Sequence, residues 1–448
     1  MLSRNNFHLS IIAILFVIYA GARALTAPPI LDKPRVLADT TAYERISREP
    51  IGSVDLWAAS RPVMFPLLLK AAQQDFDRAA AFQLALSIPA WGVLALMVSR
   101  FLRHPALQVA GFAVVLLFSL ERHIAGWDFV MMSESLSITT IILFTAACLW
   151  LLEGWHLIKV AAVLLAALLL AFTRDTNAWV LLALAALMVV AVAARWTKPK
   201  TLVLAGGLAL IFMLGNASAN RGNRWVFPLG NLLTQRVLPD SSALSYFESC
   251  GMPVSPALLQ LAGKYANSDD QAMFGGPELE SFRLWLYQHG KGCYMGWLVS
   301  SAGQQAWAAL YQTGSLISFD TVDRFFSNRY APLLPPQVGA ILYPERFTLW
   351  IWGFSTLVAV IAVWKRAWRI NALWAAFICL NLLVFPHLFL TWHGDAMAPD
   401  RHALSVGVQL YLGFWILVML LVSELTVCIR KDGAGLRSGN QQGMALRL

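Results

Sequence analysis

The chain has 448 residues, of which 58% are hydrophobic types and 13% are charged, and its formal net charge is +9. A soluble fold of this size could not bury that much apolar surface, because a large share of any globule's residues must face water. The composition therefore excludes a soluble enzyme, a disordered chain and a disulfide-rich secreted module, and it indicates an all-α polytopic membrane protein.

Apolar runs long enough to cross a bilayer recur along the chain. We interpret ten of them as membrane-spanning helices, at about 9–27, 80–99, 106–121, 133–152, 157–173, 177–195, 201–216, 347–364, 370–391 and 404–428. No small-residue cleavage site clearly follows the first run, so we expect a retained helix there. The third and seventh runs are short, and their ends are approximate.

Basic residues predict which side of the membrane each connecting segment faces. With the N-terminus inside, the inner segments carry many lysines and arginines, but their only acidic residues are Glu153 and Asp432. The two long outer segments, 28–79 and 217–346, have equal numbers of basic and acidic residues. This asymmetry predicts that both termini are cytoplasmic. It also explains the net charge without a nucleic-acid partner.

The spans divide the chain into four parts. Residues 1–216 form an N-terminal transmembrane module whose first outer loop is 28–79, and residues 217–346 form a mostly helical extracytoplasmic domain. Residues 347–430 carry the C-terminal transmembrane helices. The tail, 431–448, is polar and Gly-rich, and its composition predicts disorder.

Two of the five cysteines, Cys250 and Cys293, lie outside the predicted spans, and both are in the large outer segment. An oxidising outer compartment would let them pair, so we expect a disulfide between them. One nearby histidine, His289, does not complete the ligand set that is usual for zinc.

Ionisable residues gather near the outer ends of the predicted spans, beside the first outer loop. Outside the loops, the charged residues are Arg23, Arg122, Arg174, Arg401, Glu121, Asp128, Glu134, Asp175, Asp395, Asp400 and Glu424. All but Glu424 lie near outer ends in this topology. Helix ends that meet water also carry charges, but for the whole set we favour a site. Arginines at the outer leaflet suit a phosphate carried on a lipid, because guanidinium groups bind phosphate oxygens bidentately.

Short motifs accompany these charges in a regular order. They are Asp39-x-x-x-Tyr43 in the first outer loop, Arg61-Pro62-x-x-x-Pro66 before the second span, Met132-Ser-Glu134 at the start of the fourth, Thr173-Arg174-Asp175 at the end of the fifth, and Asp400-Arg401-His402 before the last. In order, side and spacing they resemble the lipid-phosphosugar-dependent glycosyltransferases of the GT-C fold. That group includes protein O-mannosyltransferases and lipid A aminoarabinose transferases. The resemblance covers the N-terminal half fairly continuously and the last span more weakly, and here the outer domain lies between spans seven and eight.

The resemblance implies a GT-C-like bundle and a role for each motif residue. Asp39 would be the catalytic base that activates the acceptor. The substrate-binding residues would be Arg61, Arg174 and Arg401 on the donor phosphate, with Tyr43, Glu134 and His402 lining the same site.

Each of these residues also has a plainer interpretation. Asp39 could cap the N-terminus of its helix, and Tyr43 could be an aromatic residue of the membrane interface. The carboxylate of Glu134 could favour the N-terminus of its own helix. The arginines could pair locally, in which case their partners would be Asp55 for Arg61, Asp175 for Arg174 and Asp400 for Arg401.

The stretch from His387 to His402 holds three histidines and two aspartates, but their spacing matches no metal motif. We therefore assign no metal ligand. Some members of the resembled family use a divalent cation and others do not, so a divalent metal cofactor stays an alternative.

The resemblance implies an inverting glycosyltransferase of a bacterial inner membrane. It would move a sugar from a polyprenyl phosphate to a hydroxyl of an envelope glycan, lipid or protein at the outer face. One alternative is an O-antigen ligase or polymerase that uses a lipid-diphosphate glycan and needs no acidic base in the first outer loop. Another is a lipid-linked-sugar transporter or flippase, which would need polar residues at mid-membrane depth or inverted repeats. The interiors of the spans are nearly free of charge.

Overall fold

The computed structural model describes residues 4–25, 34–266, 272–317, 323–326, 330–367 and 371–445. Within these ranges the chain is helical, and its one β-type contact is an isolated bridge between Arg35 and Val130. The predicted all-α class therefore holds for the described part of the chain.

Eight of the described helical segments are long and apolar enough to cross a bilayer, which supports a multi-pass membrane protein. They are α1 (Arg4–Leu25), α6 (Phe76–Arg100), α9 (Glu134–Leu152), α11 (Asp175–Ala193), α12 (Thr201–Arg221), α21 (Pro336–Leu342) joined to α22 (Thr348–Trp364), α23 (Ala372–Gly394) and the first part of α24 (Pro399–Ala445). We refer to them as candidate spans.

Two of the ten predicted spans are helical but fall short of this length. α7 (Pro105–Ser119) and α10 (Leu157–Ala171) have 15 residues each. At 1.5 Å per residue such a helix covers roughly 22 Å, less than the ~30 Å of a hydrocarbon core. α7 is followed by the helical turn Arg122–Phe129 after a bend of 59°, and the pair would make a ninth span if it crosses as one unit.

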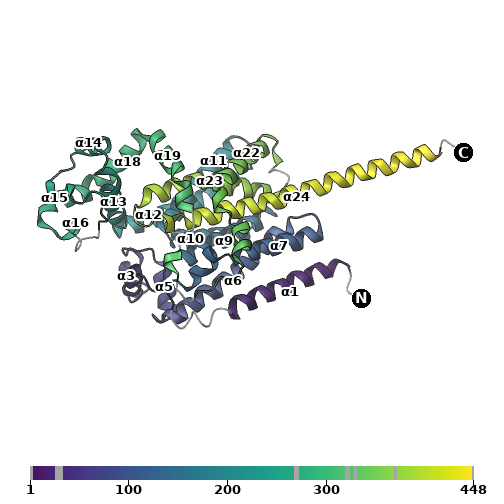
Figure 1. The fold of residues 1–448 in the computed structure, drawn as a ribbon, viewed down its shortest axis with the longest axis horizontal. Helices are drawn as coiled ribbons and strands as arrows, with labels where there is room; N and C mark the ends of the chain where they lie inside the picture. Colours follow the sequence, from purple (N-terminus) through teal and green to yellow (C-terminus); the bar gives the residue numbers. More distant parts are fainter. Residues whose placement is uncertain are drawn as a thin grey trace.

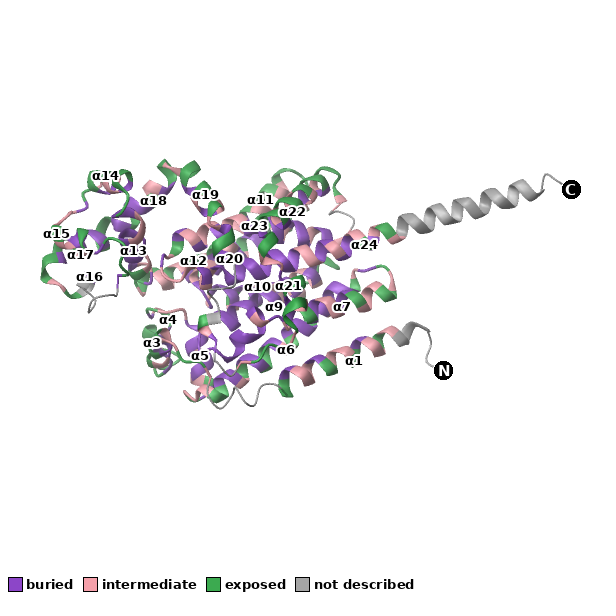
Figure 2. Ribbon diagram, viewed as in Figure 1, coloured by how far each residue is buried: buried purple, intermediate pink, exposed green. Residues whose placement is uncertain are grey.

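The long helices run side by side, and both chain ends project from the same end of the bundle (Figure 1). The opposite end carries α3 (Ala38–Ser47), and we call it the α3 end. α6 packs against α7 and α9, α10 against α9 and α12, and α24 against α23. Buried residues concentrate along α9, α23 and α24, whereas α1 presents much exposed surface (Figure 2).

A close approach in α24 depends on a missing side chain. A Cβ atom at Gly407 would clash with the hydroxyl of Tyr343, and it would also press on Ile317. Glycine therefore lets the connecting segments before α22 pack directly onto the backbone of α24. Beyond the bundle α24 continues as a helix to Ala445, so most of the tail for which composition predicts disorder is helical in this structure.

The first loop at the α3 end folds into three short helices, α3, α4 (Val54–Trp57) and α5 (Met64–Ala71). Ser53 caps α4 by accepting a hydrogen bond from the backbone N–H of Leu56. α3 begins differently from the prediction, because Leu37 occupies its N-cap position and Asp39 is its second residue. The Asp39 side chain is therefore not used for capping.

The long segment 217–346 packs in two ways. From α13 (Val226–Leu232) to α18 (Lys291–Ser300) it has its own hydrophobic core, which includes Phe247 and Trp285. Cys250, directly after α14 (Ser241–Ser249), is disulfide-bonded to Cys293 of α18, with Cα atoms 6.1 Å apart. We call this part the α13–α18 domain.

The remainder of the segment packs with the candidate spans instead. α19 (Ala302–Tyr311) contacts α23, and α20 (Thr313–Ile317) contacts α24. Leu316 and Ile317 belong to the same core as the spans. The single outer domain expected from the sequence therefore has an independently packed part and a part that rests on the bundle.

Candidate active site

Five charged side chains from distant parts of the chain meet at the α3 end of the bundle. Asp39 accepts hydrogen bonds from Arg61 Nη2 at 2.6 Å and from Arg401 Nη1 at 3.0 Å. Glu134 Oε1 lies 3.2 Å from Arg401 Nε and 3.5 Å from Arg174 Nη1. We call these five residues the arginine–carboxylate cluster.

Each member sits where a helix starts or a turn ends. Asp39 is in the first turn of α3, and Arg61 follows α4. Glu134 is the first residue of α9, Arg174 is the N-cap of α11, and Arg401 is in the first turn of α24. These positions allow long side chains to converge at one level without burying a charge in the middle of a span.

The segment before α9 holds α3 in place. Arg35 pairs its backbone N and O atoms with the chain at 129–131, at 2.8 and 2.9 Å. Thr40 donates its hydroxyl to the carbonyl of Met131 at 2.9 Å, and Tyr43 donates its hydroxyl to Ser133 Oγ at 3.4 Å. Four contacts therefore fix the helix that carries Asp39 against the start of α9.

His402 joins the cluster on the side of the α13–α18 domain. Arg174 donates from Nη2 to His402 Nδ1, while His402 Nε2 lies 3.8 Å from Asp395 Oδ2, which is beyond hydrogen-bond distance. Asp395 accepts from Asn231 Nδ2 at 3.0 Å and from the backbone N–H of Met397 at 2.9 Å. Since Asn231 belongs to α13, this domain reaches the site through Asp395.

Asp39 is ionised at neutral pH. Burial raises the pKa of its carboxyl group, but the guanidinium groups of Arg61 and Arg401 outweigh burial and hold the pKa below its ordinary value. The opposite holds for Tyr43, because burial raises the pKa of its phenol and keeps the hydroxyl protonated. Tyr43 can therefore act as the donor in its bond to Ser133.

Within the cluster three guanidinium groups face two carboxylates, and the nearby carboxylates of Asp395 and Asp175 also interact with its arginines. Among the described residues, Glu134 Oε2, Arg401 Nε and His402 Nε2 are buried without a hydrogen-bond partner. Buried polar atoms usually find a partner in the protein, in ordered water or in a ligand. The side chain of Arg61 is 37% exposed, so the cluster opens to the surroundings there. An anionic ligand that also carries hydroxyl groups fits this combination.

Local ion pairs, the plainer explanation of the arginines, involve other partners. Asp175 pairs with Arg224 Nη1 at 2.9 Å, and Asp400 pairs with Arg324 Nη2 at 3.2 Å. Arg61 pairs with Asp39, although Asp55 is nearer in the sequence. All seven residues expected to act on the substrate are thus brought together: Asp39, Tyr43, Arg61, Glu134, Arg174, Arg401 and His402.

An apolar groove of about 410 Å³ lies beside the cluster, between α5 and α6. It is lined by Met64, Leu67, Leu68, Ala71, Phe82, Ala85, Leu86 and Leu136. None of the five cluster residues lines the groove, but Met64 follows Arg61 by three positions and Leu136 follows Glu134 by two in the chain. Phe82 and Leu86 are exposed on a candidate span, which opens the groove toward lipid.

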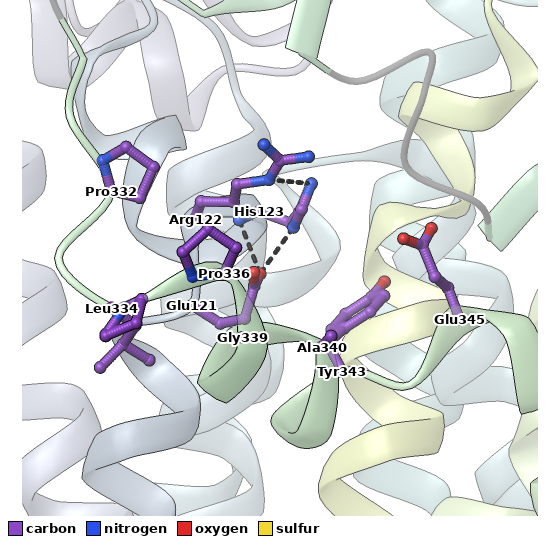
Figure 3. Close-up of a pocket in the computed structure, with 11 residues that line it drawn as sticks. Glu121, Arg122, His123, Pro332, Leu334, Pro336, Gly339, Ala340, Tyr343 and Glu345 are labelled. Carbon is purple, nitrogen blue, oxygen red and sulfur yellow. Dashed lines mark hydrogen bonds and ion pairs between the residues drawn. The ribbon is translucent and has the colours of Figure 1, made fainter.

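A second cavity, of about 170 Å³, lies between the turn after α7 and α21 (Figure 3). There Glu121 Oε2 accepts the backbone N–H of His123 at 2.8 Å and lies 2.7 Å from His123 Nδ1. Arg122 Nε donates to His123 Nε2 at 3.2 Å. These polar groups bond to one another, and none of the seven expected site residues lines this cavity.

The histidines of the 387–402 stretch lie in three different surroundings. His387 Nδ1 is 2.9 Å from Gln409 Oε1, His393 Nε2 is 3.1 Å from the carbonyl oxygen of Gln305, and His402 contacts Arg174. Within the described residues, no three histidine, cysteine or acidic side chains are gathered as a metal site would need.

Sequence analysis missed one buried ion pair that supports the site. Arg23 of α1 donates to Asp128, and the other carboxylate oxygen of Asp128 accepts from Ser135 Oγ. Gln83 Nε2 of α6 donates to the backbone carbonyls of Asp128 and Val130, at 3.0 and 3.1 Å. The sequence places Arg23 and Asp128 near the outer ends of predicted spans, but no sequence pattern indicates that they pair with each other.

Comparisons with models of known families, with characterised proteins and with solved structures find no match to this chain. The function is therefore inferred from the chemistry of the arginine–carboxylate cluster together with the motif resemblance.

Proposed function

We propose that the protein is a membrane glycosyltransferase that moves a sugar from a polyprenyl-phosphate donor to a hydroxyl group of a cell-envelope glycan, lipid or protein. The observation that carries the proposal is the meeting of Asp39 with Arg61 and Arg401 at the α3 end of the bundle. Charge asymmetry between the loops supports reaction at the outer face of a bacterial inner membrane, with both termini in the cytoplasm.

The proposed class of donor follows from two surfaces, the charged arginine–carboxylate cluster and the apolar groove between α5 and α6. The positive excess of the cluster suits a phosphate, which three guanidinium groups can bind through paired hydrogen bonds. The groove beside it, lined by Met64, Ala85 and other apolar side chains, suits the first isoprene units of a lipid carrier. A free nucleotide sugar would leave the groove unused.

The reaction would be a direct displacement at the anomeric carbon. The acceptor oxygen forms a bond to that carbon while the bond from the carbon to the phosphate oxygen breaks, and the configuration inverts. Asp39 takes the proton of the acceptor hydroxyl. The electron pair of the broken bond stays on the departing phosphate, whose charge Arg61, Arg174 and Arg401 stabilise.

Binding of the donor phosphate would also change the pKa of Asp39. Arg61 and Arg401 both hold Asp39 in the structure. A bound phosphate would draw the same guanidinium groups and reduce their effect on the carboxylate, so the pKa of Asp39 would move back toward its ordinary value. The unpaired atoms Glu134 Oε2 and His402 Nε2 would bind hydroxyl groups of the transferred sugar.

Lipid mass spectrometry of cells that lack the gene tests the proposal. The cells are complemented with the wild type, with Asp39→Asn or with the matched control Asp55→Asn, whose carboxylate lies on the exposed start of α4. We expect a polyprenyl-phosphate sugar to accumulate in the null cells and with Asp39→Asn, and to disappear with the wild type and with Asp55→Asn.

Other outcomes would replace the proposal. Accumulation of a lipid-diphosphate oligosaccharide that Asp39→Asn still relieves would support a ligase or polymerase that needs no base in this loop. If no lipid intermediate changes in the null cells, a lipid-linked donor is excluded, and transport becomes the alternative to examine.

A further inference from the structure

The part of the chain that follows the α13–α18 domain core has an unusual composition. Between Lys291 and Asp320 no residue carries a charge, although charged residues are frequent from Arg221 to Lys291. The uncharged stretch forms α18, α19 and α20 in the structure. Its helices are short, with 10, 10 and 5 residues, so none of them can cross a bilayer alone.

The exposed face of α18 and α19 carries four large apolar or aromatic side chains, with the exposed Lys291 and Gln304 at the starts of the two helices. Met295 and Val299 are exposed on α18, four residues apart, and Trp307 and Tyr311 are exposed on α19 with the same spacing. Residues four apart share one face of a helix. Val299 is 74% exposed, Trp307 67% and Tyr311 75%. We call these four residues the Trp307 stripe, and Figure 2 shows α19 exposed at the edge of the bundle.

The opposite faces of both helices meet the end of a candidate span. Tyr294 of α18 donates its hydroxyl to the backbone carbonyl of His393 at 3.1 Å. His393 Nε2 in turn lies 3.1 Å from the carbonyl oxygen of Gln305 in α19. Since α23 ends at Gly394, both helices lie at the level where that span ends.

α20, which follows α19, packs farther along the bundle, away from the α3 end. Ile317 of α20 packs against Gly407, which is eight residues after the start of α24. At 1.5 Å per residue this contact lies roughly 12 Å along the axis from the end of the span. α20 also packs against the start of α22, where Trp350 is 80% exposed on a candidate span. The stripe is thus linked through α20 to a candidate span that also exposes a large aromatic side chain.

We propose that the Trp307 stripe is a bilayer-binding surface that lies in the headgroup region of the leaflet at the α3 end. Tryptophan and tyrosine favour this region, because their rings are apolar and their N–H and O–H groups still reach water. The lack of charged residues from 292 to 319 and the position of both helices at the end of α23 favour lipid over a protein partner. The stripe would hold the α13–α18 domain at a fixed height above the arginine–carboxylate cluster, and the proposal does not depend on the reaction assigned to that cluster.

Site-directed spin labelling in vesicles tests the position of the stripe. Cys148, Cys379 and Cys428 are replaced by alanine, and the Cys250–Cys293 disulfide is kept. Nitroxide labels are placed at Val299→Cys, Trp307→Cys or Tyr311→Cys, with Ser245→Cys on the exposed face of α14 as the matched control. Each protein is reconstituted in vesicles of phosphatidylethanolamine and phosphatidylglycerol. Collision rates of the label are measured with oxygen, which enters lipid, and with a water-soluble nickel chelate.

We expect oxygen collisions to dominate at 299, 307 and 311 and nickel collisions to dominate at 245. Nickel collisions at the stripe as frequent as those at 245 would place it in water and overturn the proposal. Low collision rates with both reagents, together with dipolar broadening between labels, would indicate a second copy of the chain as the partner and would also overturn it. Intact disulfide in each labelled sample, shown by mass spectrometry, verifies that the variant has folded.

Discussion

Asp39 owes its charge state to two residues that lie far apart in the chain. Arg61 is 22 positions away and Arg401 is 362 positions away, and each donates to a different carboxylate oxygen. Their charges outweigh burial, which alone would raise the pKa of Asp39. A base with a lowered pKa is ionised at every physiological pH, so protonation of Asp39 does not limit the reaction near neutrality.

The pH profile of transfer tests this balance. A general base works only when deprotonated, so the rate falls as the pH drops through the pKa of Asp39. The wild-type acidic limb is therefore expected below the range of an ordinary carboxyl group, and Arg61→Gln moves it to higher pH by removing one lowering charge. Initial rates in proteoliposomes between about pH 2 and 8 cover both limbs. The exposed control Arg48→Gln leaves the limb in place, and an unmoved limb in Arg61→Gln contradicts the assignment.

The effect of Asp39→Asn on the rate of sugar transfer can also be estimated. Asp39→Asn keeps the size of the side chain but cannot accept the acceptor proton. We expect transfer to fall by about a hundred- to ten-thousand-fold, the usual contribution of general base catalysis. The assay measures radiolabelled sugar passed from a purified lipid donor in proteoliposomes. A fall of less than tenfold would argue that Asp39 positions Arg401 and does not take the proton.

The buried pair of Arg23 and Asp128 is expected to matter for stability. Both side chains are almost fully buried, so Asp128→Asn leaves the guanidinium group without its compensating charge. The free energy of unfolding should fall by about 3–5 kcal/mol, as for other broken buried pairs. Glu44→Gln removes an exposed pair with Arg48 and should cost less than about 1 kcal/mol. Denaturant unfolding in detergent micelles compares the two, and equal losses would contradict the prediction.

At the level of single residues, the sequence was sufficient to select the cluster but not its pairs. Glu134 and Arg401 were singled out because they lie at the same ends of predicted helices, and helix ends on one side of a membrane share a level. Asp39 was selected through the motif resemblance. Whether Arg401 meets Asp400 or Asp39 depends on side-chain direction within the first turn of α24. No sequence spacing contains that direction, and the bond between Asn231 and Asp395 was missed for the same reason.

The groove between α5 and α6 is formed by elements that the sequence did predict. The second span was expected at 80–99, and α5 follows the Arg61-Pro62 motif that precedes that span. Their combination leaves a small residue, Ala85, at the wall of the groove. A larger side chain there would fill the space without touching the arginine–carboxylate cluster.

Ala85→Phe is therefore expected to separate lipid binding from catalysis. It should raise KM for a long-chain polyprenyl donor and leave kcat/KM nearly unchanged for a donor whose lipid is shortened to one or two isoprene units. Val93→Phe is the matched control, because Val93 is exposed on the same helix but does not line the groove. Equal effects on both donors would show that the groove does not hold the lipid.

Elements shorter than a span were the least predictable. α7 and α10 were expected to be complete spans, since an apolar run does not reveal that the helix stops at Ser119 or Ala171. α19 and α20 were assigned to an outer domain because they lie between two longer polar segments. Their contacts with α23 and α24 arise from tertiary packing, which a linear pattern does not contain.

The whole molecule joins the bundle to the α13–α18 domain through a few specific contacts. The core of this domain includes Ala396, from the short connection between α23 and α24, and Arg236 stacks on Trp392 with its guanidinium carbon 3.4 Å from the ring centroid. The Cys250–Cys293 disulfide closes 43 positions of the domain's chain. Unfolding of the domain would therefore disturb the connection that precedes Arg401 and His402.

Removal of the disulfide tests this coupling. Replacing both cysteines by serine should lower the stability of the domain by about 2–5 kcal/mol. Because Asp395 is bonded to Asn231 of α13, we expect transfer activity to be lost at a lower temperature than in the wild type. Parallel thermal inactivation of the two proteins measures the shift. Cys148→Ser, within a candidate span, is the control and should behave as the wild type.

The separation of Asp39 and Arg401 has a consequence for how the protein is made. The ribosome delivers Asp39 to the membrane insertion machinery long before it delivers Arg401, and α24 is the last candidate span to be inserted. Until that moment Asp39 has only Arg61 beside it, and Glu134 lacks one of its two arginines. A nascent chain released early would thus carry two acidic residues at the α3 end with incomplete charge compensation, a feature by which quality-control proteases could distinguish it from a finished molecule.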